Sequence, residues 1–332
     1  MNTKQLFVAM YHYVRDLEHS AFPQIKGMSL DDFRRQVREL PELFEVTTLE
    51  AASDFLAGKY APSRNLCLLS FDDGLKEHYA DVTPILEEHR MQGVFFPITS
   101  CTNDHVVAPV HMNHFVMAEL GVKRYRTVFM EELRAFGLCE YAEIAVNRAT
   151  ARKTYPLDDD ETAEFKYLFN FVLPAGQRDI IVKNLFAEWI GKEREFSSEL
   201  YLSWPEAREM QAAGMVFGGH THLHRPLARL EDAELQFDLE TCWTMMTANL
   251  EAQSLWPFSY PYGKSDSFNE KVIMTLRGLG FGCAFSTENG GNFPGENAFT
   301  IRRVDCKQIM PLGTAGQAGD GHRNVALSAA GV

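Results

Sequence analysis

Two adjacent carboxylates, Asp72 and Asp73, stand where a buried strand is expected to end. They lie in S-F-D-D-G, directly after the apolar run N-L-C-L-L. Ionised carboxylates side by side repel each other, most strongly where water is scarce. A divalent cation bound by one of them would offset that repulsion and keep its neighbour ionised as a base. The pair therefore indicates metal-assisted acid-base chemistry.

A second polar cluster is the run H-T-H-L-H at 220–224. On one helical turn, His220 and His224 would point the same way, with Cβ atoms about 5 to 6 Å apart, close enough to share a metal. His222 would point elsewhere. Spacing of this kind is weak by itself, and the alternative interpretation is the polar start of a helix.

Both clusters follow a strand-like segment, so in a parallel barrel they reach the same rim. Two neutral imidazoles and one carboxylate make a three-ligand set that leaves room for water, as in many hydrolytic metal sites. Such a set suits one divalent ion, with zinc as the first choice and cobalt, nickel or manganese as alternatives.

Strand-like and helix-like segments alternate along the chain, which is the pattern of a parallel α/β sheet or barrel. About eight strands are expected, enough for a closed or nearly closed barrel. Their expected ranges are 6–11, 43–47, 65–71, 94–98, 215–218, 256–260, 281–286 and 299–304.

Two helix N-termini and a long segment without strands indicate how the chain is organised. Ser29 reads as an N-cap, and S-W-P-E at 203–206 reads as a capping box. Residues 101–200 carry helical patterns with no convincing strand, so we expect a mostly helical insertion that shapes a substrate site. The barrel is expected over 1–312, and a flexible tail over 313–332, where small residues dominate.

Composition excludes several classes of protein. The chain has 332 residues, 45% of them hydrophobic, which is typical of a soluble globular protein, and its net charge of −13 argues against a nucleic-acid partner. It has no apolar run of the roughly 18 residues that a membrane span needs. Without a signal-like N-terminus, and with six scattered cysteines expected to be reduced, it is predicted to be cytoplasmic. The sequence does not indicate an oligomeric state.

Three motifs carry a family resemblance. In order, S-F-D-D-G at 70–74, H-T-H-L-H at 220–224 and S-Y-P-Y-G at 259–263 resemble the first three motifs of the polysaccharide deacetylase family, the NodB-homology or carbohydrate esterase family 4 group. The resemblance covers residues 1 to about 310, with the insertion outside its motifs. It implies a distorted (β/α)7 barrel and metal-dependent hydrolysis of an N-acetyl group on a sugar.

The resemblance also implies roles for individual residues. Asp72 matches the general base, and Asp73, His220 and His224 match the metal ligands. Tyr262 matches the residue whose backbone amide helps to bind the oxyanion. The chemistry that follows is attack of activated water on the acetamide carbonyl, with Asp72 accepting the proton.

Two residues of the family pattern are absent here, and other residues would have to take their roles. Ser259 stands where the family has the arginine that orients the base; Arg303 could supply that charge, although such an arginine is often a surface residue. The late L-x-H motif, source of the general acid, is missing. His12, at the end of the first expected strand, is the candidate acid, with a structural histidine as the alternative reading. Further candidates for acid or substrate contact are His105, His111 and His114.

The first hypothesis is therefore a metal-dependent deacetylase of an N-acetylated sugar, saccharide or saccharide precursor. One alternative keeps the metal but cleaves a non-sugar amide C–N bond, because barrels of this kind host varied chemistry. Another is a carbohydrate-binding homologue that has lost turnover.

Overall fold

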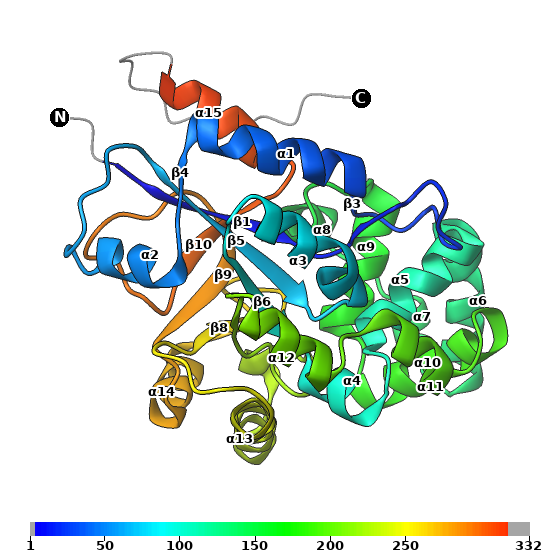
Figure 1. Ribbon diagram of the computed structural model, residues 1–332. Coiled ribbons are helices and arrows are strands. Elements are labelled where there is room, and N and C mark those ends of the chain that lie inside the picture. Colours follow the sequence, from blue (N-terminus) through cyan, green and yellow to red (C-terminus); the bar gives the residue numbers. More distant parts are fainter. Residues whose placement is uncertain (1–3, 318–332) are drawn as a thin grey trace.

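Seven parallel strands form a sheet that closes almost completely into a barrel (Figure 1). The computed structural model describes residues 4–317. In order around the sheet, the strands are β7 (Val216–Phe217), β6 (Gly93–Pro97), β5 (Leu66–Asp73), β1 (Leu6–Tyr11), β10 (Ile301–Asp305), β9 (Cys283–Asn289) and β8 (Pro257–Ser259). A short strand, β4 (Glu45–Val46), pairs with the start of β5. This architecture confirms the predicted distorted (β/α)7 barrel.

The two edges of the sheet meet at a pair of glycines. Gly219 forms a parallel bridge with Phe258 of β8. Its N–H donates to the carbonyl of Pro257 at 3.0 Å, and its own carbonyl accepts from the N–H of Ser259 at 2.8 Å. A Cβ at Gly218 would lie 2.4 Å from the Pro257 carbonyl oxygen. Only glycine therefore allows the edges to approach this closely.

Helices between the strands cover the outside of the barrel. They are α1 (Leu30–Leu43), α2 (Leu49–Leu56), the π-helical turn η1 (His78–Val82), α3 (Thr83–Glu88), α12 (Trp204–Ala212), the 3-10 turn η3 (Leu227–Arg229), α13 (Asp232–Asn249), α14 (Glu270–Leu279) and α15 (Ile309–Gln317). Two short strands, β2 (Val14–Arg15) and β3 (Met28–Ser29), precede α1. Both predicted caps are confirmed, since Ser29 accepts from the N–H of Asp32 and Ser203 forms a capping box with Glu206.

Residues 99–200 are helical and follow β6. Their helices are α4 (Thr99–Asp104), α5 (Pro109–Leu120), α6 (Val122–Ala135), α7 (Cys139–Ala142), α8 (Arg148–Thr154), α9 (Asp160–Tyr167), the π-helical turn η2 (Leu168–Val172), α10 (Ala175–Trp189) and α11 (Glu193–Leu200). They share a hydrophobic cluster with Tyr13, Leu75 and Ile98 of the barrel. Figure 1 shows most of them gathered on the side toward which β5 points. The insertion is thus packed against the end of the barrel at which the strands finish.

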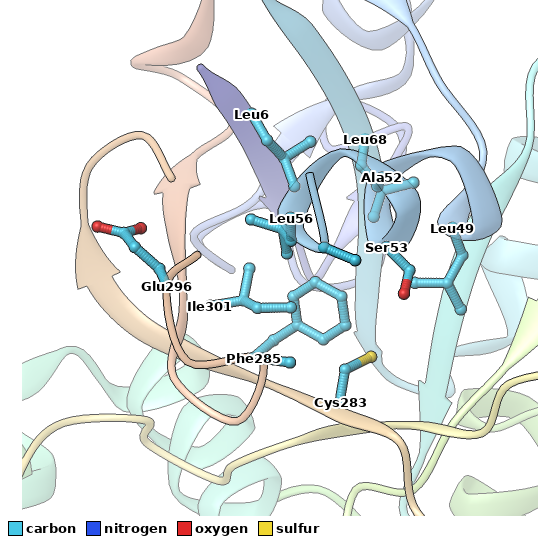
Figure 2. Close-up of a pocket in the computed structure, with 12 residues that line it drawn as sticks. Leu6, Leu49, Ala52, Ser53, Leu56, Leu68, Cys283, Phe285, Glu296 and Ile301 are labelled. Atoms are coloured by element: carbon cyan, nitrogen blue, oxygen red, sulfur yellow. The ribbon is translucent and has the colours of Figure 1, made fainter. Parts of the chain in front are cut away.

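The barrel interior is apolar where β1, β5 and β9 begin, with Leu6, Leu68 and Cys283 in one buried cluster. The rings of Phe96 and Phe285 meet 5.6 Å apart although their strands are not neighbours, so both point inward. Helix α2 packs into the same cluster. Between α2 and this cluster lies a cavity of about 150 Å³, whose walls include Leu6, Leu68 and Cys283 (Figure 2). Because the carboxylates stand at the opposite end of the strands, we assign no chemistry to this cavity.

The C-terminal boundary differs from the sequence prediction. Residues 313–317 were expected in a flexible tail, but they belong to α15. This helix packs closely on α1, since a Cβ at Gly313 would lie 2.6 Å from Cβ of Leu43. A small residue was therefore selected by packing against a neighbouring helix. Residues 318–332 of the expected tail lie outside the described residues.

All six cysteines are unpaired, and all but Cys139 are buried. They behave as small apolar residues. Within residues 4–317, no helix combines the length and the apolar character that crossing a bilayer requires.

Candidate active site

Asp73, His220 and His224 converge at the end of the barrel where the strands finish. Asp73 is the last residue of β5, and the histidines follow β7. One ligand atom from each lies within 4.8 Å of the other two. The Asp73 Oδ1 atom is 3.4 Å from Nε2 of His220 and 3.6 Å from Nε2 of His224. All three residues are largely buried, so the sequence-predicted trio is brought together in space.

The histidines reach this position on a loop and not on the helical turn that their spacing suggested. Thr221 has φ 67° and His224 has φ 53°, both in the left-handed region. The Thr221 hydroxyl accepts from the N–H of His224 at 2.8 Å. Asp238 of α13 accepts from the N–H of His222 at 2.7 Å and of Leu223 at 3.1 Å. These side-chain contacts hold a strained loop that a simple periodicity argument could not predict.

The donor atoms of the trio fit a divalent cation. Asp73 Oδ1 is buried and accepts no hydrogen bond from the described residues. Burial raises the pKa of Asp73, but His111 and His220 outweigh burial and hold the pKa well below its usual range. Nδ1 of His220 lies 2.7 Å from the Ser259 carbonyl, so Nδ1 carries a proton and Nε2 faces Asp73. Burial lowers the pKa of His220, but Asp72 and Asp73 outweigh burial and raise it, so a cation at Nε2 would take the place of a proton there. Burial, then His220, lowers the pKa of His224 to about 3, so that imidazole is neutral. One carboxylate and two neutral imidazoles are a common zinc-binding set.

Asp72 points into the barrel, where Arg303 holds it. Both oxygens of the carboxylate are engaged, because Nη1 of Arg303 donates to Oδ1 at 2.8 Å and Nη2 to Oδ2 at 2.7 Å. Burial alone would raise the pKa of Asp72, yet Arg303 and His220 outweigh burial and hold the pKa at about 2. Asp72 is therefore ionised at neutral pH.

Arg303 is only 1% exposed, so the alternative reading of a surface arginine is wrong. Its Nη2 also donates to the Ser259 hydroxyl at 2.9 Å, and its Nε donates to the Ser286 carbonyl at 2.9 Å. Ser259 in turn donates to Oδ2 of Asp72 at 3.2 Å. The short side chain at 259 thus leaves room for an arginine that arrives from another strand.

His12 lies beside Asp72 and faces solvent. Its Nε2 is 3.8 Å from Oδ2 of Asp72, and its side chain is 42% exposed. The His12 carbonyl accepts from Nε2 of His78 at 2.8 Å. Burial lowers the pKa of His78 to about 4, so that ring is neutral at pH 7. The backbone at the end of β1 is therefore held by His78, while the His12 ring stays accessible to solvent.

Tyr262 follows β8 with φ 63°, another left-handed residue at this rim. Among residues 4–317, its N–H donates to no acceptor. The Thr287 hydroxyl donates to its carbonyl at 2.6 Å, and its own hydroxyl donates to Oδ1 of Asn170 at 3.1 Å. Its ring lies 5.2 Å from that of His224. The Tyr262 ring therefore lies beside the cluster, and the oxyanion role of its N–H stays a prediction.

The three remaining histidine candidates lie in different surroundings, and one of them contacts the trio. His111 of α5 contacts Asp73, with Nε2 3.0 Å from Oδ2. His114 is partly buried, with Nδ1 3.4 Å from the Tyr13 hydroxyl. His105 is exposed after α4.

Sequence reasoning missed several partners of the site, among them Asp238 and Asn170. Asp238 had a readable signal, because it stands three residues after Leu235 and directly before Leu239, on the apolar stripe of the expected helix. The structure shows it fully buried. A buried carboxylate needs hydrogen-bond donors, and the histidine loop supplies them. Nothing in the sequence around Asn170 indicates its contact with Tyr262.

Comparisons with known proteins agree with this architecture. The family model described as polysaccharide deacetylase matches residues 59–135 and 181–284. No curated protein sequence matches the chain.

Similar solved structures cover nearly the whole chain. The deacetylase PplD of Streptococcus pyogenes, solved with acetate, has 14% identity and a TM-score of 0.57, covering 93% of this chain and 98% of its own. IcaB of Ammonifex degensii has 19% identity and a TM-score of 0.57, covering 95% and 98%. The BpsB deacetylase domain of Bordetella bronchiseptica has 17% identity and a TM-score of 0.52, covering 91% and 95%. At these identities the likeness concerns the fold.

Proposed function

This chain belongs to the polysaccharide deacetylase family, and on that premise we propose that it is a metal-dependent deacetylase. It hydrolyses an N-acetyl group of an N-acetylated sugar, saccharide or saccharide precursor, and this carbohydrate is its binding partner. The observation that carries the proposal is the convergence of Asp73, His220 and His224 beside an ionised Asp72.

Asp73, His220 and His224 hold one divalent ion, zinc before cobalt, nickel or manganese. When bound, the cation activates a water and polarises the acetamide carbonyl. Support comes from the buried, unpartnered Oδ1 of Asp73, which faces both Nε2 atoms. A carboxylate oxygen in that position needs a positive partner.

The remaining steps are assigned to side chains around the cation. Oδ2 of Asp72 accepts the proton of the attacking water, while Arg303 keeps the carboxylate oriented. The N–H of Tyr262 donates to the oxyanion of the tetrahedral intermediate. Nε2 of His12 gives a proton to the departing amine, since it lies next to Asp72 and is open to solvent.

The test measures acetate release. Protein stripped of metal and reloaded with each of the four ions is incubated with N-acetylated mono- and oligosaccharides and with small amides. We expect release from a saccharide only with metal, and a fall of roughly 10²- to 10⁴-fold in turnover in Asp72→Asn with metal retained. Hydrolysis of amides but not of sugars would instead establish the non-sugar alternative. Metal binding without acetate from any substrate would establish a carbohydrate-binding homologue.

A further inference from the structure

His111 engages the half of the Asp73 carboxylate that faces away from the two histidine ligands. Its Nε2 lies 3.0 Å from Oδ2, whereas Oδ1 faces Nε2 of His220 and of His224. The His111 side chain is 1% exposed, so the contact is shielded from bulk solvent. A donor on one oxygen fixes the plane of the carboxylate and leaves the other oxygen as the ligand atom.

Tyr201 orients His111 in turn. The Tyr201 hydroxyl lies 2.5 Å from Nδ1 of His111 and accepts from the N–H of Ala108 at 3.1 Å. Burial raises the pKa of Tyr201 well above its usual range, so the hydroxyl keeps its proton and donates it to Nδ1. The ring proton of His111 then stands on Nε2 and points at Asp73. Every donor in this chain of contacts has its acceptor.

Asp73 is in a conformation that needs support. Its φ of 76° is left-handed, which costs a non-glycine residue free energy unless the surroundings enforce it. The end of the insertion returns to this turn, because the N–H of Leu202 donates to the Gly74 carbonyl at 2.9 Å and Leu75 bridges to Tyr201. Tyr201, which contacts Nδ1 of His111, is thus anchored where Asp73 turns.

We infer that His111, backed by Tyr201, is a positioning residue that fixes the Asp73 carboxylate for cation binding. The helical insertion between β6 and α12 supplies both residues, which makes it a structural part of the metal site. This inference rests on the proposed function, because it requires Asp73 to bind a cation. It goes beyond that function by assigning a task to a segment outside the three motifs.

The test compares the Zn²⁺ affinity of the wild type with that of four variants, measured by competition with a chromophoric chelator. His111→Met removes the donor and is expected to weaken Zn²⁺ binding about 10- to 100-fold. His111→Gln keeps an N–H at the position of Nε2 and is expected to restore most of the affinity. Tyr201→Phe is expected to cause a smaller loss. His114→Met, on the same helix but hydrogen-bonded to Tyr13 and not to Asp73, is the matched control and is expected to bind as the wild type does.

The absorption spectrum of bound Co²⁺ gives a second measurement on the same variants. The visible absorption of bound Co²⁺ reports the geometry of its ligands, so it should change in His111→Met and not in His114→Met. Wild-type Zn²⁺ affinity in a folded His111→Met protein would overturn the inference while leaving the proposed function intact. Equal losses in the Gln and Met variants would also overturn it. If His111→Met does not fold, unchanged affinity in Tyr201→Phe overturns it. A wild-type protein that binds no Zn²⁺, Co²⁺, Ni²⁺ or Mn²⁺ would overturn both.

Discussion

Arg303 and Asp72 form a two-pronged ion pair inside the barrel, with nitrogen-to-oxygen distances of 2.8 and 2.7 Å. The arginine comes from β10 and the carboxylate from β5, and β1 lies between these strands. Because both side chains are buried, each would be costly to keep charged without the other. Ser259 joins the pair, because its hydroxyl accepts from Arg303 and donates to Asp72.

Arg303→Met should lower the free energy of unfolding by about 3 to 5 kcal/mol, because it leaves Asp72 buried and unpaired. Urea denaturation of metal-free protein measures this change. Replacing both residues, with Asp72→Leu added, should cost less than the single change. The control is Arg302→Met, whose partner Glu296 is partly exposed, with an expected loss of about 1 kcal/mol. An Arg303→Met protein as stable as the wild type would refute this account of the pair.

His220→Ala should lose the bound metal, because it removes one of three ligand atoms. Elemental analysis after dialysis gives the metal-to-protein ratio. His222→Ala is the matched control from the same loop, since the His222 ring lies 3.9 Å from Asp104 and away from the trio. It should keep its metal. A full complement in His220→Ala would show that the ligands are elsewhere.

His12→Ala should lower turnover by about 10²-fold or more while metal content stays unchanged, because the amine would leave without a proton donor. Acetate release under saturating substrate measures turnover. His19→Ala, an exposed histidine paired with Asp16, should have no effect. Turnover that survives in His12→Ala would assign the acid to another residue.

Asp158→Asn should destabilise the protein at neutral pH and much less in acid. Asp158 accepts from Lys26 at 2.7 Å and from Lys166 at 2.8 Å. Burial raises the pKa of Asp158, but Lys166 and Lys26 outweigh burial and lower it. A lowered carboxyl pKa contributes stability above the unfolded value of about 4, and this contribution is lost as pH falls through the folded value.

Urea denaturation of the wild type and of Asp158→Asn at pH 7 and near pH 3 tests the sign. The difference should be about 1 kcal/mol at pH 7 and should shrink in acid. A difference that does not depend on pH would mean that the carboxylate charge contributes nothing.

Much of the barrel could be predicted from sequence because its strands have local signals. The apolar run before Asp72 and the caps at Ser29 and Ser203 each placed an element correctly. The convergence of Asp73 with the histidines followed from one rule, that parallel strands end at one rim. Their roles as ligands, like the cytoplasmic location, stay predictions.

What could not be predicted depends on contacts between distant segments. The histidine loop was expected to be helical, but Asp238 and the Thr221 hydroxyl hold it in left-handed conformations. The sequence offered His111 as a candidate for acid or substrate contact. Its contact with Asp73 could not be predicted, because it depends on how the insertion packs against the barrel. Residues 313–317 have a composition typical of a tail, and packing on α1 makes them helical.

The seam between Gly219 and β8 closes the barrel one residue before His220, through a single bridge. Transient opening of this bridge would separate the histidine loop from β8 without unfolding either segment. Amide protons of Gly219 and Ser259 should therefore exchange with solvent sooner than those in the middle of β5. A bound cation that ties the loop to Asp73 should slow that exchange, so deuterium uptake at two backbone positions would report whether the centre is loaded.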